Sequence, residues 1–311
     1  MATTQVRLGA AAAAEANAMR PARSLWRDAW FQFRRHRIAM AGLIVLTILV
    51  GGTMLGPFIY TTPINIIDFG ASLEGPSAAH PFGTDDLGRD LLARALWGGR
   101  VSIAVGLTAV LLAITLGTGI GAIAGYFGKL DSPLMRLTDL FLSLPVLPLL
   151  LVIIFLFRDP LRQALGPEVG IFFMIVVVIG ILNWMPVARL VRAQFLSLKQ
   201  KEFVEAARAV GNPDGRIIWK HILPNVLSPV LVAATIGVGG AILTESTLSF
   251  LGLGFPPDVP TWGRLLFDAQ NYIEIAPHWV FFPGFLIFLT VLSINYIGDG
   301  LRDALDPRKT A

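Results

Sequence analysis

The sequence lacks several residue patterns that reactive or metal-binding sites require. It contains no cysteine, which excludes disulfides, thiolate metal sites and a cysteine nucleophile. Four histidines are spread through the chain: His36, His80, His221 and His278. Their separations give no metal-ligand spacing, and neither a GxxxxGK[ST] phosphate loop nor a GxSxG motif occurs. We therefore expect no metal site, no cofactor on this chain and no enzymatic activity of its own.

Charge is also scarce. Only 15% of the 311 residues are charged, whereas 54% are hydrophobic. Long uncharged runs of this kind predict an all-α integral membrane protein. The sequence pI is about 9.7, but the basic residues alternate with the apolar runs instead of forming one patch. That alternation is typical of membrane orientation, so we expect a lipid bilayer around the chain and no nucleic-acid partner.

The uncharged runs predict six transmembrane helices. They cover residues 38–60, 101–128, 137–157, 169–187, 222–244 and 279–298. Residues 1–23 are alanine-rich and without period, and we expect them to be disordered instead of a cleaved signal. Residues 24–37 carry Trp26, Trp30 and Phe33 among arginines, which favours a helix lying in the headgroup layer over a plain basic flank.

These features divide the chain into five parts. They are a tail with an interfacial helix (1–37), a first transmembrane helix (38–60), an external loop with a short helix (61–100), a five-helix core (101–306) and a tail (307–311). The core contains a long polar loop at residues 189–222. With the amino terminus inside, the internal segments carry 19 of the 25 lysines and arginines. We therefore expect both termini and the 189–222 loop to face the cytoplasm.

Glycine and proline predict special features in two of the spans. Gly117, Gly121 and Gly125 repeat every four residues, which places a smooth strip on one helix face. Such strips allow close helix packing in lipid, although ordinary glycine usage in a membrane helix is the alternative. Pro145 and Pro148 predict a bend or interruption in the 137–157 span.

Two acids lie near the ends of spans. We expect Asp139 to pair with Arg136, one turn away. Glu245 follows the apolar run of the fifth span, where it is either a functional acid or a carboxylate at headgroup level.

Residues 202–224, EFVEAARAVGNPDGRIIWKHILP, predict two short helices that meet at a corner. The first helix has a small, smooth face formed by Phe203, Ala206, Ala207 and Val210. Gly211 suits a helix end that needs a positive φ, Asn212 can cap the second helix and Pro213 fits its first position. Pro224 limits the second helix. The alternative is a solvated loop between two spans.

A second polar stretch, residues 80–90 (HPFGTDDLGRD), precedes the core. We expect Thr84 to cap a short helix there and Asp85 and Asp86 to favour its positive end. The apolar stripe of that helix would be Leu87, Leu91 and Ala95. As a metal site, Asp85, Asp86 and Asp90 lack the glycine-bearing pattern of a calcium loop.

Two motifs are similar to known permease motifs. Glu205-Ala206-Ala207, Gly211 after three further residues, and Ile222-Leu223-Pro224 resemble the EAA loop of ABC-transporter permeases. The general pattern has an apolar residue where this chain has His221, and the His-Ile-Leu-Pro ending is similar to the peptide and nickel branch. The stretch 82–90 is similar to a segment that precedes the core in peptide-family permeases.

The resemblance implies the second, C-type membrane subunit of a dipeptide, oligopeptide or nickel importer. Such a subunit forms half of the translocation pathway in the bacterial cytoplasmic membrane. Its implied partners are a homologous second permease, two ATPase subunits that hold ATP and Mg, and an extracytoplasmic substrate-binding protein. The residues implied to couple to the ATPases are Glu205, Ala206, Ala207, Gly211 and Pro224. Candidates for binding-protein contact or gating are Asp85, Asp86, Arg89, Asp90, Glu245 and Trp262.

Other functions stay open at this point. Within the family, a nickel chelate or a glutathione-like peptide is the alternative cargo. An ion-coupled secondary transporter is disfavoured because few ionisable groups lie deep inside any span. A membrane anchor or scaffold that transports nothing is the third class.

Overall fold

A computed structural model describes residues 25–305, which are almost entirely helical. The elements are α2 (Leu25–Arg35), α3 (Arg37–Ile59), η1 (Phe69–Ala71), α4 (Leu91–Tyr126), α5 (Gly128–Ser143), α6 (Val146–Leu165), α7 (Pro167–Leu198), α8 (Glu202–Ala209), α9 (Asp214–Arg216), η2 (Ile217–Ile222), α10 (Leu223–Phe250), α11 (Trp262–Ala269) and α12 (Pro277–Ala304). The predicted disorder of residues 1–23 and the tail at 307–311 lie outside the described residues.

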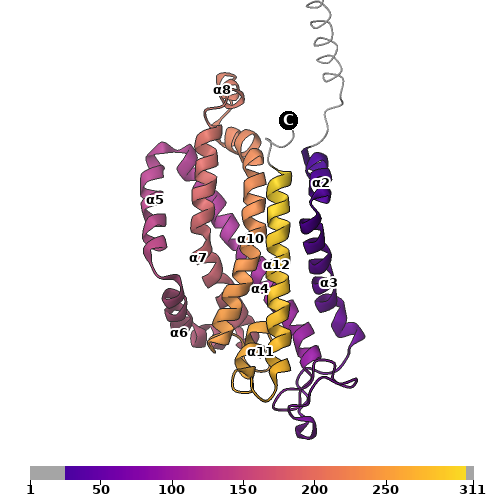
Figure 1. Cartoon of the computed structure of the whole chain (residues 1–311). Coiled ribbons are helices and arrows are strands. Elements are labelled where there is room, and N and C mark those ends of the chain that lie inside the picture. Colours follow the sequence, from indigo (N-terminus) through magenta and orange to yellow (C-terminus); the bar gives the residue numbers. More distant parts are fainter. Residues whose placement is uncertain (1–24, 306–311) are drawn as a thin grey trace, which may run out of the picture.

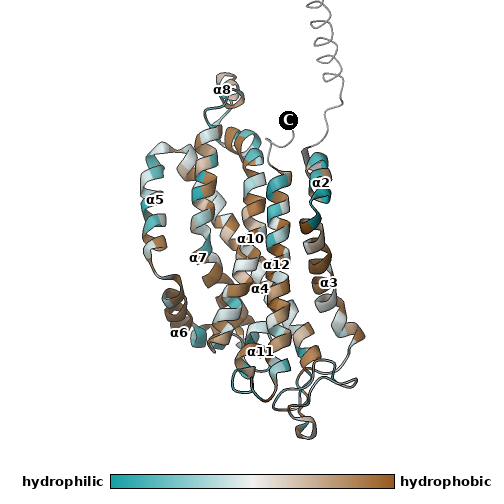
Figure 2. Cartoon of the chain, viewed as in Figure 1, coloured by the Kyte–Doolittle hydropathy of each residue, from teal (hydrophilic) through white to brown (hydrophobic). Residues whose placement is uncertain are grey.

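The long helices run side by side between two ends of the molecule (Figure 1). One end, which we name the α8 end, carries α2, α8 and the last turn of α12. The other, the α11 end, carries α11 and the segment between α3 and α4. Hydrophobic residues dominate most of the bundle, including much of α6, whereas α2 and α5 carry many polar residues (Figure 2).

The helix lengths confirm the predicted membrane architecture. Five helical segments are long and apolar enough to cross a bilayer: 37–59, 91–126, 167–198, 214–250 and 277–304. A sixth span arises if α5 and α6, which meet at an 88° bend, are counted together. The break falls at Leu144 and Pro145, as the prolines predict, because proline cannot donate the hydrogen bond that would continue α5.

The glycine strip on α4 packs directly against α7, as predicted. A Cβ at Gly117 would lie 2.6 Å from the carbonyl oxygen of Trp184, and one at Gly121 would lie 2.5 Å from that of Ala188. At Gly125, a Cβ would lie 2.5 Å from Phe195 Cβ. The two backbones are therefore closer than any side chain allows, so the strip has a packing role.

Two ion pairs fix α5 to α7 near the α8 end. Asp139 pairs with Arg189 of α7 at 2.5 Å, so the predicted pairing with Arg136 is wrong. Asp131 accepts hydrogen bonds from Arg192, one of them from Nη2 at 2.7 Å. The tertiary contact replaces the local one because α7 brings its arginines against the outer helix.

The helix predicted within residues 24–37 is present as α2, in place of a plain basic flank, and its location in the headgroup layer stays a prediction. Its buried face, Ala29 and Phe33, packs against Ala304 at the end of α12. Gln32 Nε2 donates a hydrogen bond to the Asp303 carbonyl oxygen at 3.2 Å, and Trp30 is exposed. The side chain of Trp26 lies outside the described residues.

The start of α4 corrects the prediction of a separate short helix before the second span. One helix runs without a break from Leu91 to Tyr126. Its N-cap is Asp90, whose Oδ1 accepts a hydrogen bond from the Ala93 amide at 2.7 Å. Thr84 caps nothing; its hydroxyl donates to the Ala71 carbonyl and accepts from the Glu74 amide.

The glycine strip gives a first prediction. Gly121→Leu places a side chain where the α7 backbone lies, so we expect a loss of about 1–3 kcal/mol or more of stability. Gly119→Leu is the matched control, because a Cβ there meets nothing within 4 Å. Thermal unfolding of both purified variants in detergent measures the difference, and equal melting temperatures would contradict the packing role.

Candidate functional site

The α8 end carries a helical elbow, defined here as residues 202–224 and formed by α8, α9 and η2 (Figure 1). Val204 and Ala207 are buried against Ile217 and Ile222, which join the elbow to the bundle. The outer face consists of Phe203, Ala206 and Val210, all exposed. Ala207 therefore faces inward and does not belong to the outer face that the sequence predicted.

The corner of the elbow depends on Gly211. Its φ is +84°, as predicted, in a region that side chains with a Cβ rarely adopt. Asn212 does not cap the second helix. Its backbone N–H and its Nδ2 both donate to the Ala207 carbonyl oxygen, at 3.2 and 3.0 Å. Asn212 thus closes α8, and Pro213 occupies the N-cap position of α9.

Tyr126, the last residue of α4, ties the elbow to the bundle. Its hydroxyl donates a hydrogen bond to Asp214 Oδ1 at 2.5 Å, and Lys199 Nζ donates to its carbonyl oxygen at 2.7 Å. The elbow also runs without interruption through η2 into α10. Pro224 lies in the first turn of α10, so the prediction that it limits the second helix is wrong. Sequence reasoning missed Tyr126, because nothing in its own surroundings signals a partner 88 residues away.

Both ends of the elbow are therefore connected to long helices. Glu205 and the basic residues around it stay exposed on the rim, where they can meet another protein. These basic residues are Lys201, Arg208, Arg216 and Lys220. The elbow combines an exposed, small apolar face with a charged rim, which suits docking into a groove more than chemistry.

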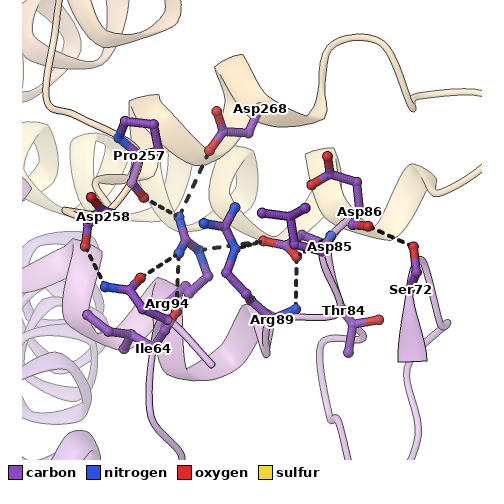
Figure 3. Close-up of polar contacts among 12 residues, drawn as sticks. Ile64, Ser72, Thr84, Asp85, Asp86, Arg89, Arg94, Pro257, Asp258 and Asp268 are labelled. Carbon is purple, nitrogen blue, oxygen red and sulfur yellow. Dashed lines mark hydrogen bonds and ion pairs between the residues drawn. The ribbon is translucent and has the colours of Figure 1, made fainter. Parts of the chain in front are cut away.

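At the α11 end, a buried charge network joins segments that are distant in sequence (Figure 3). Asp85 Oδ2 accepts a hydrogen bond from Arg89 Nε at 2.6 Å and lies 3.8 Å from Arg94 Nε. Asp268 of α11 pairs with Arg264 at 2.7 Å and lies 3.9 Å from Arg94 Nη2. Arg94 is wholly buried between the two carboxylates.

The same guanidinium also satisfies backbone groups. Arg94 donates to the carbonyl oxygen of Ile64 at 3.2 Å, to Asn65 Oδ1 at 3.1 Å and to the carbonyl oxygen of Pro257 at 3.0 Å (Figure 3). Burial raises the pKa of the Asp268 carboxyl, and the charges of Arg264 and Arg94 oppose part of that rise. Arg94 therefore holds the segment between α3 and α4 and the loop before α11 on one helix.

The predicted residues of the 80–90 stretch lie in and around this network. Asp85, Arg89 and Asp90 are buried, whereas Asp86 is partly exposed and accepts a hydrogen bond from Tyr272 at 3.4 Å. Asp90 Oδ2 accepts from Tyr60 at 2.7 Å and lies 2.8 Å from His80 Nδ1. These carboxylates form their hydrogen bonds and ion pairs within the chain, so they fix the position of the 80–90 stretch.

Glu245 and Trp262 form a second cluster at this end. Glu245 is completely buried and accepts hydrogen bonds from Ser102 of α4 at 3.0 Å and Ser249 at 2.7 Å. Trp262 donates through its backbone N–H to Ser102 Oγ at 3.3 Å and through Nε1 to the Ala95 carbonyl at 3.0 Å. Glu245 is therefore enclosed by protein, because α10 continues beyond it and α4 and α11 cover it.

Comparison with known proteins identifies the architecture. A family model described as binding-protein-dependent transport system inner membrane component matches residues 113–311. A second, the N-terminal transmembrane domain of oligopeptide transport permease C, matches residues 24–76. The chain belongs to this permease family. The predicted resemblance to the dipeptide and oligopeptide importers is therefore confirmed.

Individual relatives cover most of the permease. It is 42% identical over 286 residues to the dipeptide transport system permease protein DppC of Alkalihalophilus pseudofirmus, covering 92% of this chain and 90% of that protein. It is 42% identical over 292 residues to the oligopeptide transport system permease protein OppC of Haemophilus influenzae, with 92% and 89% covered.

A solved structure supports the fold. The inward-facing MetNI methionine ABC transporter matches with a TM-score of 0.54 at 20% identity, over 70% of the permease and 96% of that chain.

The network around Arg94 gives the second prediction. Arg94→Gln removes the hydrogen bonds to Ile64, Asn65 and Pro257 in a buried site, while Asp85 and Asp268 keep Arg89 and Arg264, so we expect a loss of about 1–3 kcal/mol. We expect much faster backbone hydrogen exchange across residues 61–89 of the permease. Arg162→Gln, at an exposed arginine of α6, is the control. Equal exchange in the two variants would show that Arg94 does not hold this segment.

The hydrogen bonds of Glu245 give the third prediction. Glu245→Ala leaves the hydroxyls of Ser102 and Ser249 without their acceptor and opens a cavity, so we expect a loss of about 2–4 kcal/mol. Glu245→Gln keeps the volume and one acceptor oxygen. We expect its loss of stability to be less than half of the loss in Glu245→Ala. Thermal unfolding of the permease compares them. Identical unfolding of the alanine variant and the unmodified chain would refute the role of this cluster in joining α4 to α10.

Proposed function

We propose that this chain is one of two membrane-spanning subunits of an ATP-driven importer of dipeptides and oligopeptides. The chain's membership of the permease family supports a transport role, and relatives named for dipeptide and oligopeptide transport support the cargo. The observation that carries the proposal is the elbow, a partner-docking element joined to two long helices. A homologous second permease would supply the other half of the pathway.

In this proposal the outer face of the elbow docks into an ATPase subunit, which holds the ATP and Mg. Phe203, Ala206 and Val210 would contact the ATPase, and Val210 is 84% exposed in the chain alone. Movement of the docked elbow reaches α4 through Tyr126 and α10 through η2. ATP shifts the permease between states only through contacts that differ between them.

The α11 end would face the extracytoplasmic side and receive the substrate-binding protein. The excess of lysine and arginine in segments near the α8 end supports this orientation in a bacterial inner membrane, with both termini cytoplasmic. The segment between α3 and α4 and the loop before α11 form the surface at this end. Arg94 fixes both, so the binding protein would meet a preformed surface.

Glutathione-like peptides are the second candidate cargo. The glutathione transport system permease protein GsiD of Pectobacterium atrosepticum is 38% identical to this chain over 288 residues, covering 92% of each. Uptake of a labelled dipeptide by the reconstituted importer, in competition with glutathione, separates the two. Uptake driven by an ion gradient without ATP would instead indicate a secondary transporter.

The elbow gives the fourth prediction. Ala206→Trp puts an indole on the exposed outer face of α8 without disturbing Val204 or Ala207 behind it. We expect ATP-driven peptide uptake by the reconstituted complex to fall at least tenfold, and co-purification of the ATPases to weaken. The control is Gly52→Trp on α3, where a Cβ meets nothing within 4 Å. Undiminished uptake by Ala206→Trp would count against docking through this face.

A further inference from the structure

A cavity of about 580 Å³ opens at the α8 end, between the α4–α5 turn and the elbow. It is lined by Tyr126, Phe127, Gly128, Lys129, Leu130, Lys199, Arg208 and Asp214. Tyr126 of α4 and Asp214 of the elbow both line the cavity and bond to each other, so the cavity lies where the elbow meets the bundle. It is therefore distinct from the outer face formed by Phe203, Ala206 and Val210.

The charges around the cavity favour an anion. Three cationic side chains, Lys129, Lys199 and Arg208, line it with one carboxylate. That carboxylate, Asp214, accepts the hydrogen bond of the Tyr126 hydroxyl. Lys199 uses one proton of its ammonium on the Tyr126 carbonyl at 2.7 Å, which leaves two for a ligand. The site thus has spare donors and a net positive charge.

Apolar side chains continue from the cavity along the outside of the bundle. Phe127 and Leu130 line it and are 40% and 46% exposed. On α5, which lies at the edge of the bundle in Figure 1, Leu137 and Leu140 are exposed as well. A ligand with an anionic head and an apolar tail fits these two adjoining surfaces. Its head would lie in the basic cavity and its tail along the exposed leucines of α5.

We propose that this cavity binds the headgroup of an anionic phospholipid from the leaflet on the α8 side. Basic sites at the cytoplasmic ends of transmembrane helices suit such headgroups, because positive charge and apolar surface lie within one lipid length. An acidic segment of a partner protein would match the charges but not the exposed leucines of α5. The inference rests on the proposed membrane orientation and is independent of the cargo and of ATPase docking.

A lipid bound at this site would contact the elbow and the ends of two long helices together. Lys199 ends α7, Tyr126 ends α4 and Arg208 lies on α8, so one phosphate would join three elements that otherwise meet through few polar contacts. The bound lipid would hold the elbow against α4.

Lipid binding to the delipidated full-length chain tests the proposal. The chain is titrated in detergent with phosphatidylglycerol or phosphatidylcholine, and the bound fraction is measured by native mass spectrometry. For Lys129→Gln with Lys199→Gln, we expect phosphatidylglycerol to bind roughly 30-fold more weakly, from about one kcal/mol per lost charge. The control, Lys201→Gln with Lys220→Gln, removes the same charge from two exposed positions, one just before the elbow and one on it. It should change binding less than threefold.

Several outcomes would overturn the proposal. Equal losses in both double variants would indicate general surface attraction, and equal binding of phosphatidylcholine would exclude recognition of the anionic headgroup. Displacement of the lipid by millimolar inorganic phosphate alone would indicate a free-phosphate site. Unchanged lipid binding with weaker ATPase co-purification would assign the cavity to a protein partner.

Single Lys129→Gln separates binding from folding, because this exposed side chain makes none of the bonds that Lys199 makes to Tyr126. A loss of binding with an unchanged melting temperature supports the site, and full binding counts against it. Peptide uptake by the complete importer is measured separately. Failure of the lipid site therefore leaves the proposed transport function intact, and the reverse also holds.

Discussion

The backbone contact between α4 and α7 is the constraint on which the other sites depend. In lipid, apolar surface gains little by leaving its surroundings for a neighbouring helix, so close van der Waals packing has to hold the pair together. Gly117, Gly121 and Gly125 supply it by removing every side chain that would separate the backbones. The register that they impose places Tyr126 beside Lys199, which sets the base of the elbow.

At 36 residues, α4 reaches both ends of the molecule. Tyr126 bonds to the elbow at one end, whereas Ser102 bonds to Glu245 and Arg94 bonds to the segments before α4 and α11 at the other. The kind of contact differs between the two ends. The elbow is held by partly buried hydrogen bonds and by a buried apolar cluster, whereas the other end is held by buried ion pairs. Removing one partner of a buried ion pair leaves an uncompensated charge, which is costly.

The sequence predicted the features that local chemistry determines. The glycine period, the break at Pro145 and the positive φ of Gly211 follow from a few neighbouring residues, and the structure contains all three. The contacts that the sequence did not predict are those whose partner is distant. Asp139 pairs across 50 residues with Arg189, and Glu245 meets Ser102 across 143. A hydropathy profile reports how apolar a segment is, but not which helix covers it.

The same distinction explains why the elbow can be predicted from a motif and its contacts with the bundle cannot. Glu205, Ala206 and Gly211 lie within seven residues, so their pattern is visible in the sequence as a short motif. Tyr126 and Arg94 matter through the ends of one long helix, and each looks ordinary in its own surroundings. Because one long helix contacts both the elbow and the α11 end, a change in the packing of α4 would reach both. Close-packed interiors switch between states instead of bending continuously, so such a change needs two arrangements of packed helices and not a flexible chain.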